Sequence, residues 1–163
     1  MVNVVRHKTN TGKQLKVALE NLEGKVGKVG WFEKSKYEND ISVAYVATIQ
    51  EYGYPPQNIP ARPFMRPTII QKQKEWKVIA ESGAKAILKG TRTIDNVMEA
   101  IGLKAAGDIR KTISLIWSPP LSPLTIQARL RKRSNKKVVG NLTKPLIDTG
   151  IMFGTLTNTV EDE

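Results

Sequence analysis

The sequence has no cysteine and a single histidine, and these two features narrow the chemistry available to the chain. Without cysteine, neither a disulfide framework nor a thiolate metal site can form. The one histidine, His7, lies in a polar N-terminal stretch, so a serine nucleophile has no suitable imidazole base. The carboxylates are scattered and lack the spacing of a calcium-binding loop. We therefore expect no enzymatic activity, no cofactor and no metal site.

Long apolar runs are also missing. No stretch reaches the length needed to span a bilayer, and residues 1–16 lack the apolar centre of a signal peptide. We therefore expect no membrane partner and a protein that stays in the cytoplasm where it is made, unless a larger assembly carries it out. With 163 residues, 40% hydrophobic and 25% charged, the chain fits one domain over residues 1–163, with residues 1–10 as a flexible arm.

Acidic residues are absent from one long segment. Between Ile109 and Ile147 there is no aspartate or glutamate, although the whole chain has 15 of them and a net charge of +11. The same segment contains the basic stretch 129–137, whose cations are Arg129, Arg131, Lys132, Arg133, Lys136 and Lys137. Such a stretch favours a polyanion or an acidic protein surface as its partner. Because no aromatic residues are interleaved, it is equally typical of a solvated, mobile loop.

The pattern of apolar residues predicts an α+β fold. Apolar residues at helical spacing predict helices over residues 15–22 and 43–52, and long helices over residues 68–88 and 94–113. Alternating β-branched residues predict strands over residues 26–32 and 156–160. The expected architecture is a small antiparallel β-sheet packed against two long α-helices, with long proline-rich and basic loops. A third strand is expected, at a position that the pattern does not define.

Several residues are predicted to begin or pack these helices. The expected N-caps are Asp40 or Ser42 for the helix ending at 52, Thr93 for the second long helix, Thr125 for a short basic helix, and Asp148 or Thr149 for a last turn. Gly102 and Gly107 weaken the second long helix unless they allow close packing.

Residues 59–67, Ile-Pro-Ala-Arg-Pro-Phe-Met-Arg-Pro, form the most distinctive segment. Three prolines hold the backbone extended, so side chains must anchor it. Phe64 is expected to be the buried anchor, together with Met65. Arg62 or Arg66 is then expected to pair with a carboxylate such as Glu51, or with a partner protein. Pro67 suits the first position of the following helix.

A second proline-rich segment, residues 117–123, contains Trp117, Pro119 and Pro120 and cannot form regular structure. Trp117 is expected in an exposed patch, because two prolines follow it closely. Together with the residues above, these complete the predicted interface candidates, which are Arg62, Phe64, Arg66, Trp117, Pro119, Pro120, Arg129, Arg131, Lys132, Arg133, Lys136 and Lys137.

The order of motifs resembles one family of virion proteins. The apolar helix AYVATIQEYG of residues 44–53, the segment PARPFMRP of residues 60–67 and the segment KPLIDTGIM of residues 144–152 follow one another with a long helical region between the last two. This arrangement resembles the tail-completion, head–tail joining or neck proteins of long-tailed bacteriophages, including the HK97-type putative tail components. The resemblance covers roughly residues 26–160, and the last two segments together carry it.

The resemblance implies a structural role and specific partners. Six copies would form a ring in the virion neck that joins the tail to the head connector, after synthesis in the host cytoplasm. The implied partners are a head connector or adaptor and a tail terminator or tube, with DNA passing through the ring. The alternative, from the residues themselves, is a nucleic-acid-binding protein that uses the basic stretch 129–137. A virion hydrolase is disfavoured because the chain offers no suitable base.

Overall fold

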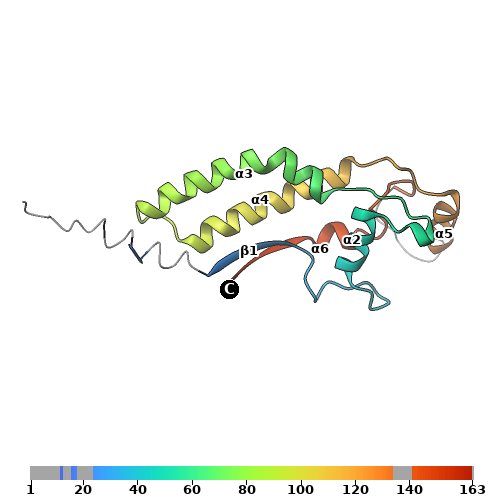
Figure 1. Ribbon diagram of the computed structural model, residues 1–163. Helices are drawn as coiled ribbons and strands as arrows, with labels where there is room; N and C mark the ends of the chain where they lie inside the picture. The colour runs from blue at the N-terminus through green and yellow to red at the C-terminus, as the bar shows by residue number, and fades with distance from the viewer. Residues whose placement is uncertain (1–11, 13–15, 18–23, 134–140, 163) are drawn as a thin grey trace, which may run out of the picture.

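The computed structural model describes residues 12, 16, 17, 24–133 and 141–162. Figure 1 shows an elongated molecule in which a helical hairpin and a two-stranded sheet occupy one part and shorter elements occupy the other end. Along the chain the elements are β1 (Lys25–Gly30), α2 (Val43–Tyr52), the 3-10 helix η1 (Pro55–Gln57), α3 (Met65–Leu88), α4 (Ile94–Leu115), α5 (Pro123–Arg133), α6 (Ile151–Thr155) and β2 (Thr157–Asp162). The predicted arm and the predicted helix over residues 15–22 fall almost entirely outside the described residues.

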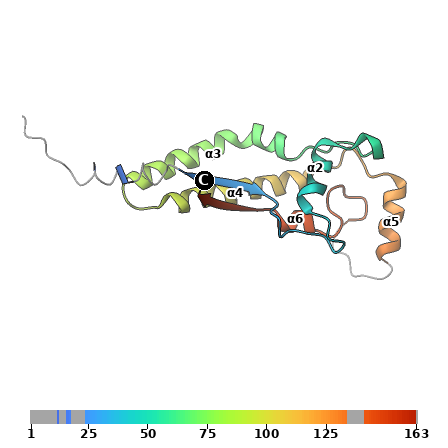
Figure 2. The same ribbon diagram turned by 60° about the horizontal axis from the view of Figure 1, so that its bottom comes forward.

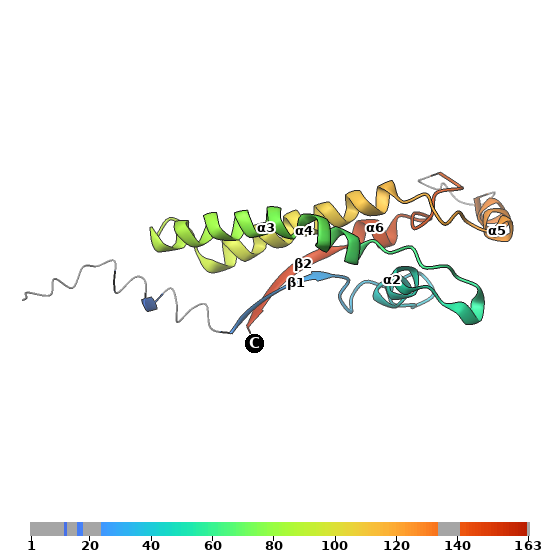
Figure 3. The ribbon, with the colours of Figure 1, turned by 45° about the horizontal axis from the view of Figure 1, so that its top comes forward.

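The two strands pair antiparallel, with Lys25 opposite Asp162 and Gly30 opposite Thr157. In Figure 1 helix α4 runs between α3 and this sheet, and Figure 3 shows both strands on one side of the helical hairpin. The predicted α+β fold, a small antiparallel sheet with two long helices, is therefore confirmed. Among the described residues, the remaining β pairing consists of two isolated bridges, so the predicted third strand is not found there.

Two glycines allow α4 to approach its neighbours closely. A Cβ atom added at Gly102 would lie 2.7 Å from the Cβ of Asn158 on β2, and one added at Gly83 of α3 would lie 2.2 Å from a methyl carbon of Val97 on α4. Of the two alternatives, close packing applies at Gly102, although the neighbour is a strand rather than a helix. At Gly107, which has no atom within 4 Å of such a Cβ, only the weakening of the helix remains.

Phe64 lies at the centre of the core and is fully buried, as predicted. It is surrounded by residues of α2, α4 and α6 and by Leu156, which precedes β2. Its ring meets the ring of Trp31 edge-on, with centroids 5.7 Å apart, and the Trp31 indole donates a hydrogen bond of 2.7 Å to the carbonyl of Met152. This core connects the extended segment before α3 to the last helix of the chain.

The helix starts follow the predictions only in part. The Thr93 hydroxyl accepts the backbone N–H of Asn96, as expected for an N-cap. Helix α3 begins at Met65, so Pro67 is its third residue and not its first. Helix α5 begins at Pro123, and its start is capped by Ser122 rather than Thr125, because the Ser122 hydroxyl accepts the N–H of Thr125.

The caps of the short helices are weaker than predicted. Ser42 is the N-cap of α2, but its side chain makes no capping hydrogen bond. Helix α6 begins after Gly150, whose φ of 80° is left-handed, and the Thr149 hydroxyl accepts the N–H of Ile151 at 3.4 Å. Glycine adopts a left-handed φ at little energetic cost, so the backbone conformation of Gly150, more than a side-chain cap, defines where α6 begins.

Candidate protein interface at the proline-rich end

The shorter elements gather at the end of the molecule opposite the turn between α3 and α4, as Figures 1 and 2 show. We call this part the proline-rich end and define it as α2, residues 53–64, residues 116–122, α5 and residues 141–150. Much of it has no regular secondary structure. Its conformation therefore depends on specific hydrogen bonds between side chains and backbone carbonyl or N–H groups.

Glu51 joins α2 to the start of α3. Its carboxylate accepts backbone N–H groups from Phe64 at 2.6 Å, Met65 at 2.9 Å and Arg66 at 3.1 Å. These N–H groups, at the N-terminus of α3, have no acceptor within the helix, and the helix dipole favours a negative charge there. Burial opposes ionisation of Glu51, but the hydrogen bonds from these N–H groups and from the Arg66 side chain outweigh it and lower the pKa of the carboxyl.

Arg66 makes the ion pair that the sequence predicts. Its Nε lies 3.0 Å from a Glu51 carboxylate oxygen, and an Nη donates to the Glu51 carbonyl. The guanidinium also lies over the ring of Tyr52, 4.6 Å from the centroid. About half of the Arg66 side chain remains exposed, so the residue can still contact a partner.

Arg62 connects α2 to the second proline-rich segment. Its guanidinium donates to the carbonyl of Pro119 at 2.7 Å, to the carbonyl of Pro120 at 2.8 Å and to the side-chain oxygen of Gln50 at 3.3 Å. Its backbone N–H donates to the carbonyl of Gln50 at 2.7 Å. Only 4% of the residue is exposed, so Arg62 holds two loops together from inside the molecule.

Arg129 holds the segment before α6 in place through hydrogen bonds to its carbonyls. One of its Nη atoms donates to the carbonyls of Leu142, Lys144 and Ile147, at 3.1, 2.8 and 3.4 Å. Its Nε lies 3.4 Å from a carboxylate oxygen of Asp148. The side chain is one-tenth exposed, which removes this cation from the surface that the basic stretch was predicted to form.

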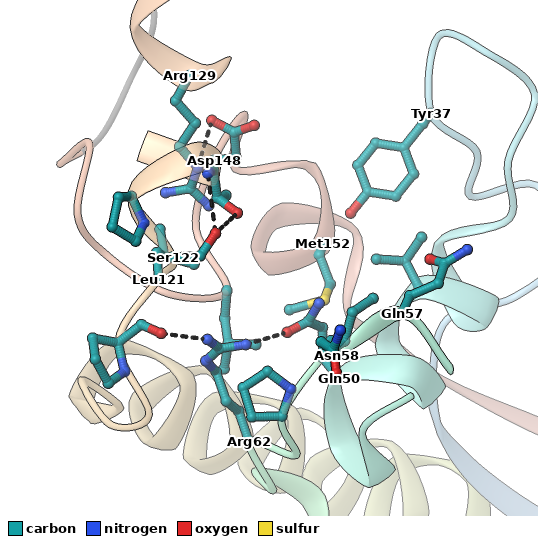
Figure 4. Close-up of a pocket in the computed structure, with 17 residues that line it drawn as sticks. Tyr37, Gln50, Gln57, Asn58, Arg62, Leu121, Ser122, Arg129, Asp148 and Met152 are labelled. Carbon is teal, nitrogen blue, oxygen red and sulfur yellow. Dashed lines mark hydrogen bonds and ion pairs between the residues drawn. The ribbon is translucent and has the colours of Figure 1, made fainter. Parts of the chain in front are cut away.

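A pocket of about 690 Å³ lies between these segments. Figure 4 shows Arg62 on one side of it, Arg129 with Asp148 on another, and Tyr37 across from them. Burial raises the pKa of the Tyr37 hydroxyl, and the nearby Asp148 charge adds to this. Five separate parts of the chain contribute to the lining, which is the arrangement typical of a ligand or peptide pocket.

Lys144 and Trp117 form a second contact at this end. The Lys144 ammonium lies over the indole of Trp117, 3.8 Å from the ring centroid, and has no hydrogen-bond acceptor. Burial lowers the pKa of this lysine. Trp117 itself is 55% exposed, as predicted, so the unoccupied part of its ring is available to a partner.

The predicted interface candidates therefore separate into three groups. Phe64 is buried, as predicted, while Arg62 is 4% exposed and the Arg129 side chain is one-tenth exposed, so these three side chains are used in contacts within the chain. Seven others lie at the proline-rich end or on its border. Arg66, Trp117, Pro119, Pro120 and Arg131 are at least partly accessible, and Lys132 and Arg133 lie in the helical backbone of α5. Lys136 and Lys137 lie outside the described residues.

The sequence did not indicate the pocket. Tyr37, Gln50 and Asp148 line it from segments far apart in the chain, and none of them belongs to a recognisable ligand-binding motif. One signal was present, because arginines between prolines have few local partners and must find distant ones. Most acceptors of Arg62 and Arg129 are main-chain carbonyls. Every residue has a carbonyl, so the sequence does not indicate which residues these arginines bind.

No family model matches the chain, and searches of curated proteins and of solved structures find no significant match. Across the part of the chain that the structure describes, no helix is long and apolar enough to cross a membrane. The same residues contain no group of three or more histidine, aspartate or glutamate side chains that could hold a metal ion.

Proposed function

We propose that this chain is a structural virion protein of a long-tailed bacteriophage, which forms a ring at the neck and joins the tail to the head connector. One observation carries the proposal beyond the resemblance. The three segments quoted for the resemblance meet in the fold: Ala47, Phe64 and Met152, one from each, belong to one buried cluster, and Arg66 pairs with Glu51. All three segments also contribute to the lining of the pocket at the proline-rich end.

The surface at this end is suited to protein contacts. Large apolar side chains stand exposed on α2, on the segment that precedes α5 and on α5 itself, namely Tyr45, Tyr52, Trp117, Leu124 and Leu130. Three of these five residues are aromatic, and aromatic residues are enriched in protein interfaces. Rigid prolines beside them reduce the ordering cost of binding. This composition supports recognition without a covalent step.

A ring requires contacts between two different surfaces of neighbouring copies, because a contact that pairs the same surface twice closes at a dimer. We expect purified protein to be a monomer or a ring of six, and to be hexameric in the neck. A negative-stain image at high concentration tests this directly. A stable two-fold dimer with a large apolar interface would contradict the ring.

The functional test uses phage particles. Loss of the protein should leave DNA-filled heads and finished tails that do not join, or tails with a malformed end. Changing Arg131, Lys132 and Arg133 together to glutamate should block joining, and we expect the variant to keep its fold, because single surface ion pairs contribute little to stability. The matched control changes Lys74, Lys77 and Lys85 of α3 to glutamate, which alters the charge equally on the other part of the molecule.

The outcomes separate the hypotheses. Normal infectious particles without the protein would reject the neck assignment. Normal particles from the first triple variant alone would remove the basic stretch from the interface. If the purified protein instead binds DNA with a steep salt dependence that the first triple variant loses, the nucleic-acid-binding alternative is favoured.

A further inference from the structure

The Arg62 guanidinium is a buried charge without a carboxylate partner among the described residues. All three of its acceptors are neutral: two proline carbonyls and the Gln50 amide. An arginine side chain has five N–H groups, so two remain after these three hydrogen bonds. Buried charges are normally paired, because an unpaired ion that is removed from water loses the hydration that stabilises it.

The neighbouring charges do not supply the missing anion. Of the charged residues that line the pocket, two are arginines and one is Asp148, and Asp148 pairs with Arg129. The lining therefore carries one positive charge in excess. Burial, followed by repulsion from Arg129, lowers the pKa of Arg62, in agreement with a guanidinium that no carboxylate stabilises.

The rest of the lining is suited to a peptide. Ile59, Pro60, Leu121 and Pro123 contribute apolar side chains to the lining. Figure 4 shows the Arg62 guanidinium between the carbonyl that it binds and Gln50, within the group of lining side chains. The volume of about 690 Å³ is within the range of pockets that enclose a few side chains or a small ligand.

We propose that this pocket binds a carboxylate side chain, presented by an extended segment of a partner protein whose flanking residues are apolar. A carboxylate can accept two hydrogen bonds from one guanidinium, and it neutralises the excess charge. Apolar flanking residues match the proline, leucine and isoleucine walls. The inference goes beyond the neck role, because the isolated chain binds such a segment whether or not it is part of a virion.

A nucleic acid fits these observations less well. Each phosphate of a nucleic acid is followed by polar sugar and by further phosphates, which would face the apolar walls without counter-charges. The single excess positive charge also differs from the rows of lysine and arginine that phosphate backbones require. Charge complementarity and the apolar walls together therefore favour an acidic peptide.

The test measures binding to the full chain with the arginine Nε–Hε signals of an NMR spectrum. The probe is N-acetyl-leucyl-glutamyl-leucinamide, and its matched control replaces the glutamyl residue with glutaminyl. We expect the Arg62 signal to shift with the acidic probe, and at least tenfold weaker binding of the control, on the order of one charge-assisted hydrogen bond. Equal binding of the two probes would overturn the proposal.

Two variants locate the site without removing Arg62. Leu121→Glu places a carboxylate in the pocket wall and should abolish probe binding, while Leu121→Gln, of similar size, should retain most of it. Gln71→Glu on the exposed side of α3 makes the same charge change elsewhere and should leave binding unchanged. Undiminished binding to Leu121→Glu would reject the pocket, and displacement of the probe by equimolar inorganic phosphate or an oligonucleotide would assign it to phosphate groups instead.

Discussion

Replacing Glu51 with glutamine tests whether one buried carboxylate determines where α3 begins. The change keeps the size and shape of the side chain but removes its charge and one of its two acceptor oxygens. If the remaining oxygen stays with the N–H groups of Phe64 and Met65, the new amide group faces the N–H of Arg66, which is also a donor. One buried N–H then loses its acceptor, and two hydrogen bonds lose the contribution of the charge.

The expected cost follows from these three changes. Hydrogen bonds to charged groups contribute about 1.5–3 kcal/mol each, against about 1 kcal/mol for neutral ones, and a lost N-cap costs about 1 kcal/mol. The half-exposed Arg66 side chain adds little, because it can turn to water. We therefore expect Glu51→Gln to lower the free energy of unfolding by about 2–4 kcal/mol, a large part of the total for a single domain.

The pH dependence provides the stricter test. The pKa of Glu51 is lowered in the folded state, so its contribution to stability is complete above the unfolded pKa of about 4.3 and is lost as pH falls through the folded value. Urea unfolding followed by circular dichroism should show a constant difference between wild type and Glu51→Gln from pH 7 to pH 5. That difference should shrink at lower pH.

The control is Glu81→Gln on the exposed surface of α3, where the nearest cation lies 3.9 Å away and both partners are exposed. It should change stability by less than about 0.5 kcal/mol. Equal effects of the two substitutions would refute the assignment of Glu51 as the cap of α3. A Glu51→Gln effect that is the same at every pH would show that the charge is not its cause.

Four further substitutions test the core, the helix packing and the buried lysine by thermal or urea unfolding. Phe64→Ala should cost about 3–5 kcal/mol, and unchanged stability would show that the segment before α3 is not anchored there. Gly83→Ala should cost about 1–3 kcal/mol through overlap with Val97, whereas Gly107→Ala should gain up to about 1 kcal/mol; the reverse order would refute the packing of α3 on α4. Lys144→Met should leave stability unchanged or raise it, because the ammonium has no acceptor; a loss above about 2 kcal/mol would mean that its contact with the indole dominates.

Features with a local signal could be predicted from the sequence. The cap at Thr93, the burial of Phe64 and the pairing of Arg66 with Glu51 follow from residue type and from the spacing of neighbours. The two strands and two long helices follow from periodicity. In each of these predictions, the residues that determine the feature are close in sequence or have few other possible contacts.

The incorrect predictions concern features that are determined by contacts between residues far apart in the sequence. Helix α3 begins two residues before Pro67 because Glu51 accepts the three N–H groups that precede the proline. The basic stretch predicts that Arg129 is a surface cation. Its side chain instead points inward, because it donates hydrogen bonds to carbonyls 13 to 18 residues further along the chain. The pocket that contains Arg62 is built from five segments, and two of the three acceptors of Arg62 are main-chain carbonyls, which every residue has.

Arginines that bind backbone carbonyls have a consequence for how freely the surrounding sequence can change. Arg62, Arg110 and Arg129 together hold carbonyls of residues 119, 120, 142, 144, 147, 153 and 156. A carbonyl is the same for every amino acid, so these arginines fix the path of the loops and leave the outward side chains free to vary. A saturation mutagenesis map should therefore show three intolerant arginines beside tolerant positions such as Pro120 and Leu142. A surface built in this way can acquire a new partner by substitution while its backbone stays in place.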